Sequence, residues 1–164
     1  MTAGPAWLDV ARSHIGVREV PGPASSPVVR LWLAKLRAWW QDDETPWCGV
    51  FAAACVQAAG LPTPAAWYRA KAWAAWGIAI DPALATPGTV LVFDRHGGGG
   101  HVGFYIGRRN QWFRVLGGNQ ADGVNEMWIS AARCIAARWP AGVPVVGVPV
   151  RLADDGQAAS INEE

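Results

Sequence analysis

The sequence predicts an α+β fold in which helices pack on a small antiparallel β-sheet. Before residue 78, apolar side chains recur at helical spacing between proline and glycine boundaries, whereas after Pro87 they alternate with a period of two. The chain has 164 residues, of which 51% are hydrophobic, so it can enclose one substantial core. Because no repeat or long linker divides it, we predict a single domain over 1–164, with a core at about 6–150 and a frayed polar tail at 153–164.

Four helices are predicted in the first half of the chain, each with a proline near its start. Their ranges are about 5–15, 27–40, 46–59 and 65–76. Ser26 is a candidate N-cap for the second helix, and Pro27 suits its first position because no N–H is needed there. Gly16, Gly60 and Gly77 follow the other three and mark their ends.

Short strands are predicted after Pro87, in the segments GTVLVF, HVGFYIG and QWFRVLGG. The glycine-rich stretch DRHGGGG is expected to join the first two as a hairpin. The segments VNEMWIS and VPVVGVPVRL are expected to add two more strands.

The composition argues against several classes of function. Charged residues make up 16% of the chain and the formal net charge is +1, so no charge excess suggests nucleic acid or an anionic membrane as a partner. No apolar run reaches the roughly 18 residues of a membrane span. The first residues lack the features of a secretory signal peptide, so we expect synthesis in the cytoplasm, with release or export by other means. The 11 tryptophans fill a core or form a face that binds sugar or cell wall.

The stretch TPWCGVFAAACVQAAG places a thiol at a helix start. Thr45 can cap this helix and Pro46 suits its first position, so Cys48 falls in the first turn. Unpaired N–H groups and the positive end of the helix dipole favour a thiolate there, which predicts a lowered pKa for Cys48. The same N–H groups can bind a developing oxyanion, and Trp47 and Gln120 are second choices for this part of the site.

The other two cysteines do not have this position. Cys55 lies two helical turns further on in an apolar run and is expected to be a small buried residue. The chain has three cysteines, Cys48, Cys55 and Cys134. They are too few to form the disulfide framework of a small secreted domain.

A thiolate nucleophile needs a base, and three histidines are available. His14 lies in the first predicted helix and His96 in the glycine-rich loop. His101 opens a strand, where alternation places it on the same face as Gly103 and Tyr105. Gly103 leaves room for a helix end to approach the imidazole, and a strand is a rigid mount, so His101 is the candidate base. A purely structural histidine fits the same pattern.

A third group must orient the imidazole. The strand QWFRVLGGNQ ends in Asn119 and Gln120, and an amide carbonyl can accept a hydrogen bond from an imidazole N–H. We predict Asn119 for this role, although Gly117, Gly118 and Asn119 also form a plausible turn.

Four segments in this order, PWCGVFAAACVQAAGL, PGTVLVF, GHVGFYIG and VLGGNQ, resemble papain-like peptidoglycan hydrolases of the CHAP and NlpC type. With ARSHIGVREVPG near the N-terminus, they are similar to a small single-domain branch found in phage and bacterial genomes. The resemblance covers about 6–150. It implies a papain-like fold with the nucleophile at a helix N-terminus. We expect no cofactor and no metal, and the chain has no calcium loop like that of some relatives.

The resemblance also implies a site. The family's cysteine and histidine carry over onto Cys48 and His101, and its third polar residue onto Asn119, with Gln120 as the second choice. Some relatives have an acidic residue where this chain has Gly117, so a triad fits better than a quartet. The implied reaction is hydrolysis of an amide bond in the wall peptide through a thioester.

The resemblance leaves the bond and the biological setting open. An N-acetylmuramoyl-L-alanine amidase and a cysteine endopeptidase both fit, as do a phage endolysin and an exported antibacterial effector. The expected partner is bacterial peptidoglycan, bound by a monomer. Asp43, Glu44 and Tyr105 are weak candidates for substrate binding.

Three alternatives remain at this point. A protein-directed cysteine peptidase, or a deamidating or transacylating toxin, would keep the chemistry and change the substrate. A non-catalytic, tryptophan-rich wall-binding domain would have the same fold but no catalytic activity. A zinc site would have to use Cys48, Cys55, His96 and His101, which lack a paired CxxC spacing.

Overall fold

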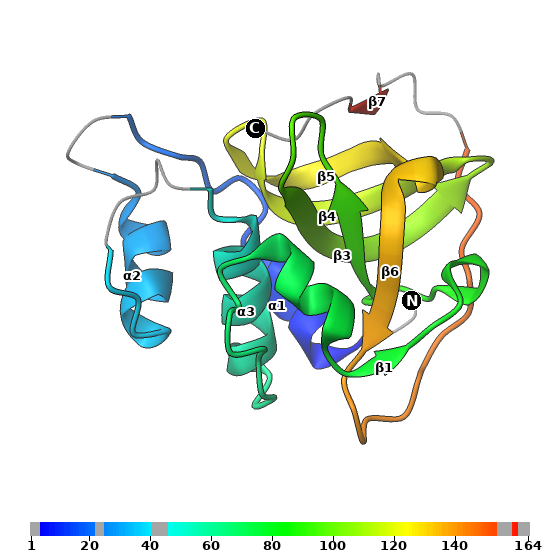
Figure 1. The fold of residues 1–164 in the computed structure, drawn as a ribbon, viewed down its shortest axis with the longest axis horizontal. Helices are drawn as coiled ribbons and strands as arrows, with labels where there is room; N and C mark the ends of the chain where they lie inside the picture. Colours follow the sequence, from blue (N-terminus) through cyan, green and yellow to red (C-terminus); the bar gives the residue numbers. More distant parts are fainter. Residues whose placement is uncertain (1–3, 22–24, 41–45, 154–158, 161–164) are drawn as a thin grey trace.

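The structure, a computed structural model, describes residues 4–21, 25–40, 46–153 and 159–160 (Figure 1). Its helices are α1 Ala6–Ser13, α2 Pro27–Lys35 and α3 Cys48–Ala58, with short 3₁₀ helices η1 Ala70–Ala75, η2 Pro82–Leu84 and η3 Ala131–Arg133. Its strands are β1 Ile78–Ala79, β2 Val90–Asp94, β3 Gly100–Arg109, β4 Trp112–Gln120, β5 Gly123–Ser130, β6 Cys134–Trp139 and β7 Ala159–Ser160. Within these ranges no helix has both the length and the apolar character needed to cross a bilayer.

The described strands form one sheet in the order β1-β6-β2-β3-β4-β5-β7. The first six run antiparallel to their neighbours, and β7 adds a short parallel pairing to β5. The predicted hairpin is confirmed, because β2 pairs with β3 across the glycine-rich turn and Phe93 lies opposite His101. The predicted α+β class is therefore confirmed. Of the tail predicted to be frayed, 159–160 form β7, and 154–158 and 161–164 lie outside the described residues.

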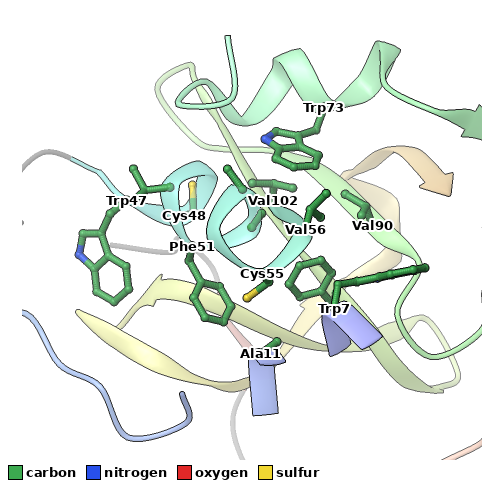
Figure 2. Close-up of a cluster of buried hydrophobic side chains, with 14 of the residues drawn as sticks. Trp7, Ala11, Trp47, Cys48, Phe51, Cys55, Val56, Trp73, Val90 and Val102 are labelled. Carbon is green, nitrogen blue, oxygen red and sulfur yellow. The ribbon is translucent and has the colours of Figure 1, made fainter. Parts of the chain in front are cut away.

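Helix α3 is the centre of the main core (Figure 2). It contacts α1 and α2 as well as β3 and β4, and Phe51, Cys55 and Val56 are fully buried. A helix that is apolar around its whole circumference suits this position. Burial of a side chain such as Phe51 contributes about 1.5–3 kcal/mol, so packing more than helix propensity stabilises α3. Packing therefore also fixes where the N-terminus of α3 lies relative to the sheet.

Helix α2 starts as predicted and ends earlier than predicted. The Ser26 hydroxyl accepts a hydrogen bond from the Val29 N–H, and Pro27 is the first helical residue. The helix stops at Lys35 instead of continuing to about residue 40. Arg37 has φ +57°, with hydrogen bonds from its N–H to the Ala34 carbonyl and from the Ala38 N–H to the Leu33 carbonyl. This pair of bonds is a Schellman closure, here formed without the usual glycine.

The predicted helix over 65–76 is wrong. Only η1 is helical there, and it is a short 3₁₀ segment. The indole N–H of Trp73 donates to the Trp67 carbonyl at 3.0 Å, and that of Trp76 donates to the Pro62 carbonyl at 3.0 Å. These tertiary bonds and the burial of both rings override the local helical spacing.

One strand was predicted in the wrong place. The segment 143–152 forms no strand, although Arg151 makes an isolated bridge to Arg108. Pro144 and Pro149 have no N–H to donate to a ladder. The position beside β2 is instead filled by β6, whose sequence CIAARW has no clear alternation of apolar and polar residues.

Candidate active site

Cys48 is the first residue of α3 and follows the N-cap residue Trp47. Pro46 therefore lies before the cap and not in the first helical position, and the predicted cap, Thr45, lies outside the described residues. The N–H groups of the first turn have no partners within the helix. Cys48 is 5% exposed, so its sulfur is almost closed off from water. The prediction of a thiol in the first turn is confirmed.

The thiol of Cys48 is hydrogen-bonded to the side chain of His101 on β3. Burial alone would raise the pKa of Cys48, but the net pKa is lowered. The lowering comes first from the hydrogen bond with His101, then from the charge of His101, and then from the backbone N–H groups of Val102 and Gly49. The direction agrees with the prediction. The main cause of the lowered pKa is the imidazole of His101. The N–H group at the start of the helix that contributes is that of Gly49.

Val102 of β3 can assist because it lies beyond the ladder that β3 forms with β4. The ladder between β3 and β4 begins at the pair Phe104 and Leu116 and does not include Val102. The Tyr105 N–H donates toward β2, to the Thr89 carbonyl, so by alternation the Val102 N–H points to the opposite side of β3, where it meets the sulfur. Figure 2 shows Cys48 and Val102 side by side above the core. Strand β3 thus provides both an imidazole and a backbone donor.

The partner of the His101 ring is Gln120. Nε2 of His101 lies 2.9 Å from Oε1 of Gln120, and both residues are buried, at 1% and 0% exposed. The prediction of Asn119 for this role is not what the geometry shows. Asn119 is also buried, but its backbone has φ +55°.

A β-bulge accounts for this difference. Gly117 pairs with Asn125 and Gln120 pairs with Gly123, so β4 has two residues where β5 has one. Strict alternation from Gly117 would have placed Asn119 on the face of His101. The extra residue moves Gln120 onto that face instead. The sequence signal was present, because Gly-Gly-Asn within a strand is typical of a bulge.

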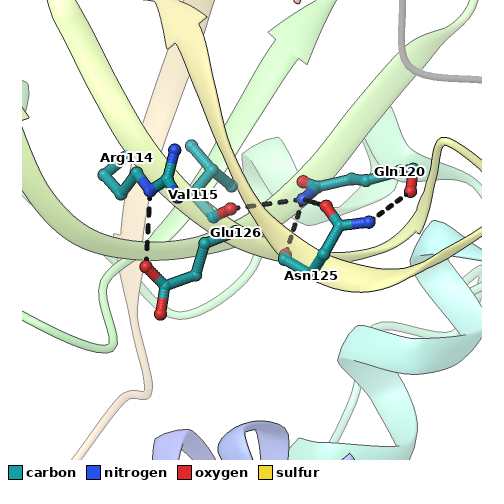
Figure 3. A network of polar contacts seen from close by, with 5 residues as sticks. All are labelled: Arg114, Val115, Gln120, Asn125 and Glu126. Atoms are coloured by element: carbon teal, nitrogen blue, oxygen red, sulfur yellow. Dashed lines mark hydrogen bonds and ion pairs between the residues drawn. The ribbon is translucent and has the colours of Figure 1, made fainter. Parts of the chain in front are cut away.

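The orientation of the Gln120 amide is fixed by its other hydrogen bonds (Figure 3). Its Nε2 donates to the carbonyls of Val115 at 3.2 Å and Asn125 at 2.8 Å, and to Oδ1 of Asn125 at 3.2 Å. Nδ2 of Asn125 in turn donates to the Gln120 carbonyl at 2.6 Å. Oε1 is therefore the atom that faces His101. Because Oε1 can only accept, Nε2 of His101 carries a proton and Nδ1 is left to face the sulfur.

Gly117 makes this contact possible. A Cβ at position 117 would lie 2.5 Å from Oε1 of Gln120 and 3.2 Å from Nε2 of His101. Any side chain here would push the two groups apart. Gly103 has a different role from the one predicted, since its space is filled by Val115 of β4 and not by a helix end.

The weaker candidates are mostly placed elsewhere. The hydroxyl of Tyr105 is bonded to the backbone of Val150, and its ring belongs to the second core cluster with Phe93 and Phe113. Trp47 packs near Trp32 and has no hydrogen-bond partner for its buried Nε1 in the described part of the chain. The two acidic candidates, Asp43 and Glu44, lie outside the described residues.

The remaining thiols and imidazoles do not join the site. Burial raises the pKa of Cys55 and of Cys134, as expected for unreactive thiols. His14 packs edge-on against Trp32, and His96 is exposed in the hairpin turn. In the ranges that the structure describes, no three His, Cys, Asp or Glu residues form a metal-binding group.

The arrangement is a chain of thiol, imidazole and amide carbonyl, shielded from water at a helix start. Such a chain can produce a thiolate, transfer a proton and hold the imidazole in one tautomer. Backbone N–H groups beside the sulfur can bind a developing negative charge. No protein-family model matches this chain, and no curated protein matches it either.

Proposed function

We propose that this chain is a cysteine hydrolase that cleaves an amide bond in the peptide part of bacterial peptidoglycan. The observation that carries the proposal is the hydrogen-bonded series Cys48, His101 and Gln120. The resemblance to papain-like hydrolases of the CHAP and NlpC type supplies the substrate class. A thiol at the start of a helix that packs on an antiparallel sheet is also compatible with a papain-like fold.

In the proposed reaction, the Cys48 thiolate attacks the amide carbonyl carbon, and the carbonyl electron pair moves onto oxygen. The backbone N–H of Cys48, which has no partner within α3, donates to that oxyanion. His101 then gives its Nδ1 proton to the leaving nitrogen as the C–N bond breaks, and a thioester remains. Gln120 stabilises the imidazolium through Nε2 without adding a charge.

The thioester is then hydrolysed, and in this step His101 acts as a base instead of an acid. His101 takes a proton from water as its oxygen attacks the thioester carbonyl, and the C–S bond breaks. The acid product leaves, and the thiolate and imidazolium are restored. All of these steps use groups of this chain and water, and a delivery route such as phage lysis or export would bring the protein to the wall.

Clearing of purified peptidoglycan tests the proposal. Wild-type protein should lower the turbidity of a wall suspension and release new amino groups. Cys48→Ser and His101→Ala should each reduce this rate by about 10³-fold or more. Cys134→Ser is the matched control because Cys134 is a thiol outside the site, and it should keep the wild-type rate. Equal clearing by Cys48→Ser would overturn the nucleophile assignment, whereas wall binding without any clearing by the wild-type protein would favour the wall-binding alternative.

A further inference from the structure

A group of four aromatic side chains lies at the edge of the main core and has no role in the site described above. We call Trp39, Trp40, Trp67 and Tyr68 the aromatic shelf. Their rings are close, with centroids 4.5 Å apart for Trp39 and Trp40 and 5.0 Å for Trp39 and Tyr68. Trp39 is 75% exposed. Together the four rings form a contiguous aromatic patch, and an exposed aromatic face in such a patch can contact a ligand.

The shelf contains a small hollow. Trp39, Trp40, Pro46 and Tyr68 line a pocket of about 200 Å³. Pockets for drug-sized ligands are usually about 300–1,000 Å³, so this one suits a single ring. Its walls are aromatic faces and a proline ring, with polar N–H and O–H groups of Trp and Tyr as the available donors.

The hollow lies near the start of α3, the helix that carries Cys48. Pro46 is two residues from Cys48, so their Cα atoms are at most about 7.6 Å apart. The backbone of Trp67 and Tyr68, two members of the shelf, packs on the first turn of α3. A Cβ at Gly49 would lie 2.4 Å from the Trp67 carbonyl oxygen and 3.2 Å from that of Tyr68. The shelf and the thiol are thus held on the same helix start.

The chemistry of the hollow favours a sugar ring. The face of an aromatic ring is negative, so it attracts the C–H groups on the apolar face of a pyranose, while hydroxyl groups at the sugar's edge can bond to N–H, O–H or water. A cationic ligand also binds aromatic faces. The Arg69 guanidinium already lies 5.8 Å from the centroid of the Tyr68 ring and opposes a second cation there.

We propose that the aromatic shelf binds the sugar ring to which the scissile amide is attached. This rests on the proposed function and makes it more specific. Because the hollow lies near Cys48, a short acyl link would place the amide at the sulfur while the sugar occupies the shelf. The substrate class is therefore an N-acylated peptide on an amino sugar, as in the N-acetylmuramoyl-L-alanine bond, and not a cross-bridge far from the glycan.

Binding to the inactive Cys48→Ala protein tests the shelf without any turnover. The probes are N-acetylmuramoyl-L-alanyl-D-isoglutamine and the same dipeptide without the sugar, titrated by calorimetry. The sugar-bearing probe should bind tighter. Trp39→Leu in this background should weaken its binding by about 5- to 100-fold, the range found when a stacking aromatic ring is removed from a nucleobase site. Trp39→Tyr should retain most of the affinity, since it keeps an aromatic face.

A control and two contrary outcomes complete the test. Leu84 is 63% exposed and is not part of the shelf, so Leu84→Ala should leave both titrations unchanged. Equal affinity for the two probes, or no effect of Trp39→Leu, would overturn the proposal that the shelf binds sugar. It would leave the proposed hydrolase activity standing. Displacement of the probe by choline would mean that the shelf is a cation site. Sugar binding by a protein that clears no wall would instead overturn the proposed function alone.

Discussion

Oε1 of Gln120 lies 2.9 Å from Nε2 of His101, and the adjacent amide, Asn119, does not occupy that position. The Gln120 amide is held in this orientation by Val115 and Asn125. Contacts with Val115 on β4 and Asn125 on β5 therefore fix the Gln120 amide, and this amide orients the imidazole of His101.

Gln120→Ala should lower kcat/KM far more than Asn119→Ala. A hydrogen bond to a charged group contributes about 1.5–3 kcal/mol, so the loss at Gln120 should be about 10- to 100-fold. Steady-state hydrolysis of soluble muropeptides by both variants measures this. A larger loss for Asn119→Ala would return the orienting role to the residue that the sequence favoured.

Gly117→Ala should reduce activity through Gln120. The added methyl would lie 2.5 Å from Oε1 of Gln120, so the amide must move away from the imidazole. A double-mutant cycle with Gln120→Ala checks the cause, because the two losses should be strongly non-additive. Fully additive losses would show that the methyl acts by another route, such as a general distortion of β4.

Cys48 should be alkylated by iodoacetamide at pH values where an ordinary thiol is protonated. Its pKa is lowered in the folded protein, so the thiolate persists above that lowered value and is lost only as the pH falls through it. The stabilisation that comes with the thiolate disappears over the same pH range. The His101→Ala substitution removes the largest contribution that lowers the pKa of Cys48, so this pKa should rise. At pH values below the pKa, each unit of the rise reduces the thiolate fraction about tenfold.

Mass spectrometry of the alkylated peptides gives the readout. Cys55 and Cys134 are internal controls and should react slowly, because burial raises the pKa of both. Equal labelling of the three cysteines in the folded protein would contradict the assignment of Cys48 as the activated thiol. So would a His101→Ala profile identical to that of wild type.

Tyr105→Phe should lower stability and leave catalysis unchanged. The Tyr105 hydroxyl donates to the Val150 carbonyl at 3.2 Å and accepts from the Val150 N–H at 3.0 Å. Loss of these bonds should cost about 1–2 kcal/mol in the free energy of unfolding and speed hydrogen exchange at Val150. Denaturant unfolding and kcat/KM are the paired measurements. A raised KM with unchanged stability would support the earlier assignment of Tyr105 to substrate binding.

Much of the fold was predictable because its local signals agree with the tertiary structure. Ser26 and Pro27 mark the start of α2, and alternation after Pro87 marks β2 to β5. The failures occurred where distant contacts decided the outcome. Trp73 and Trp76 donate to carbonyls earlier in the chain, and β6 is a strand because β2 offers it an open edge.

The sequence by itself determined the chemical parts of the site: a thiol at a helix start, an imidazole at a strand start and two amides at a strand end. It also contained Gly-Gly-Asn, which predicted a turn and which forms a bulge in the sheet. The tertiary structure decided which amide faces His101, because one extra residue in β4 reverses the faces of all residues after it. It also brought Trp67 and Tyr68 onto the first turn of α3 through backbone contacts at Gly49, and no local pattern in the sequence specifies such contacts.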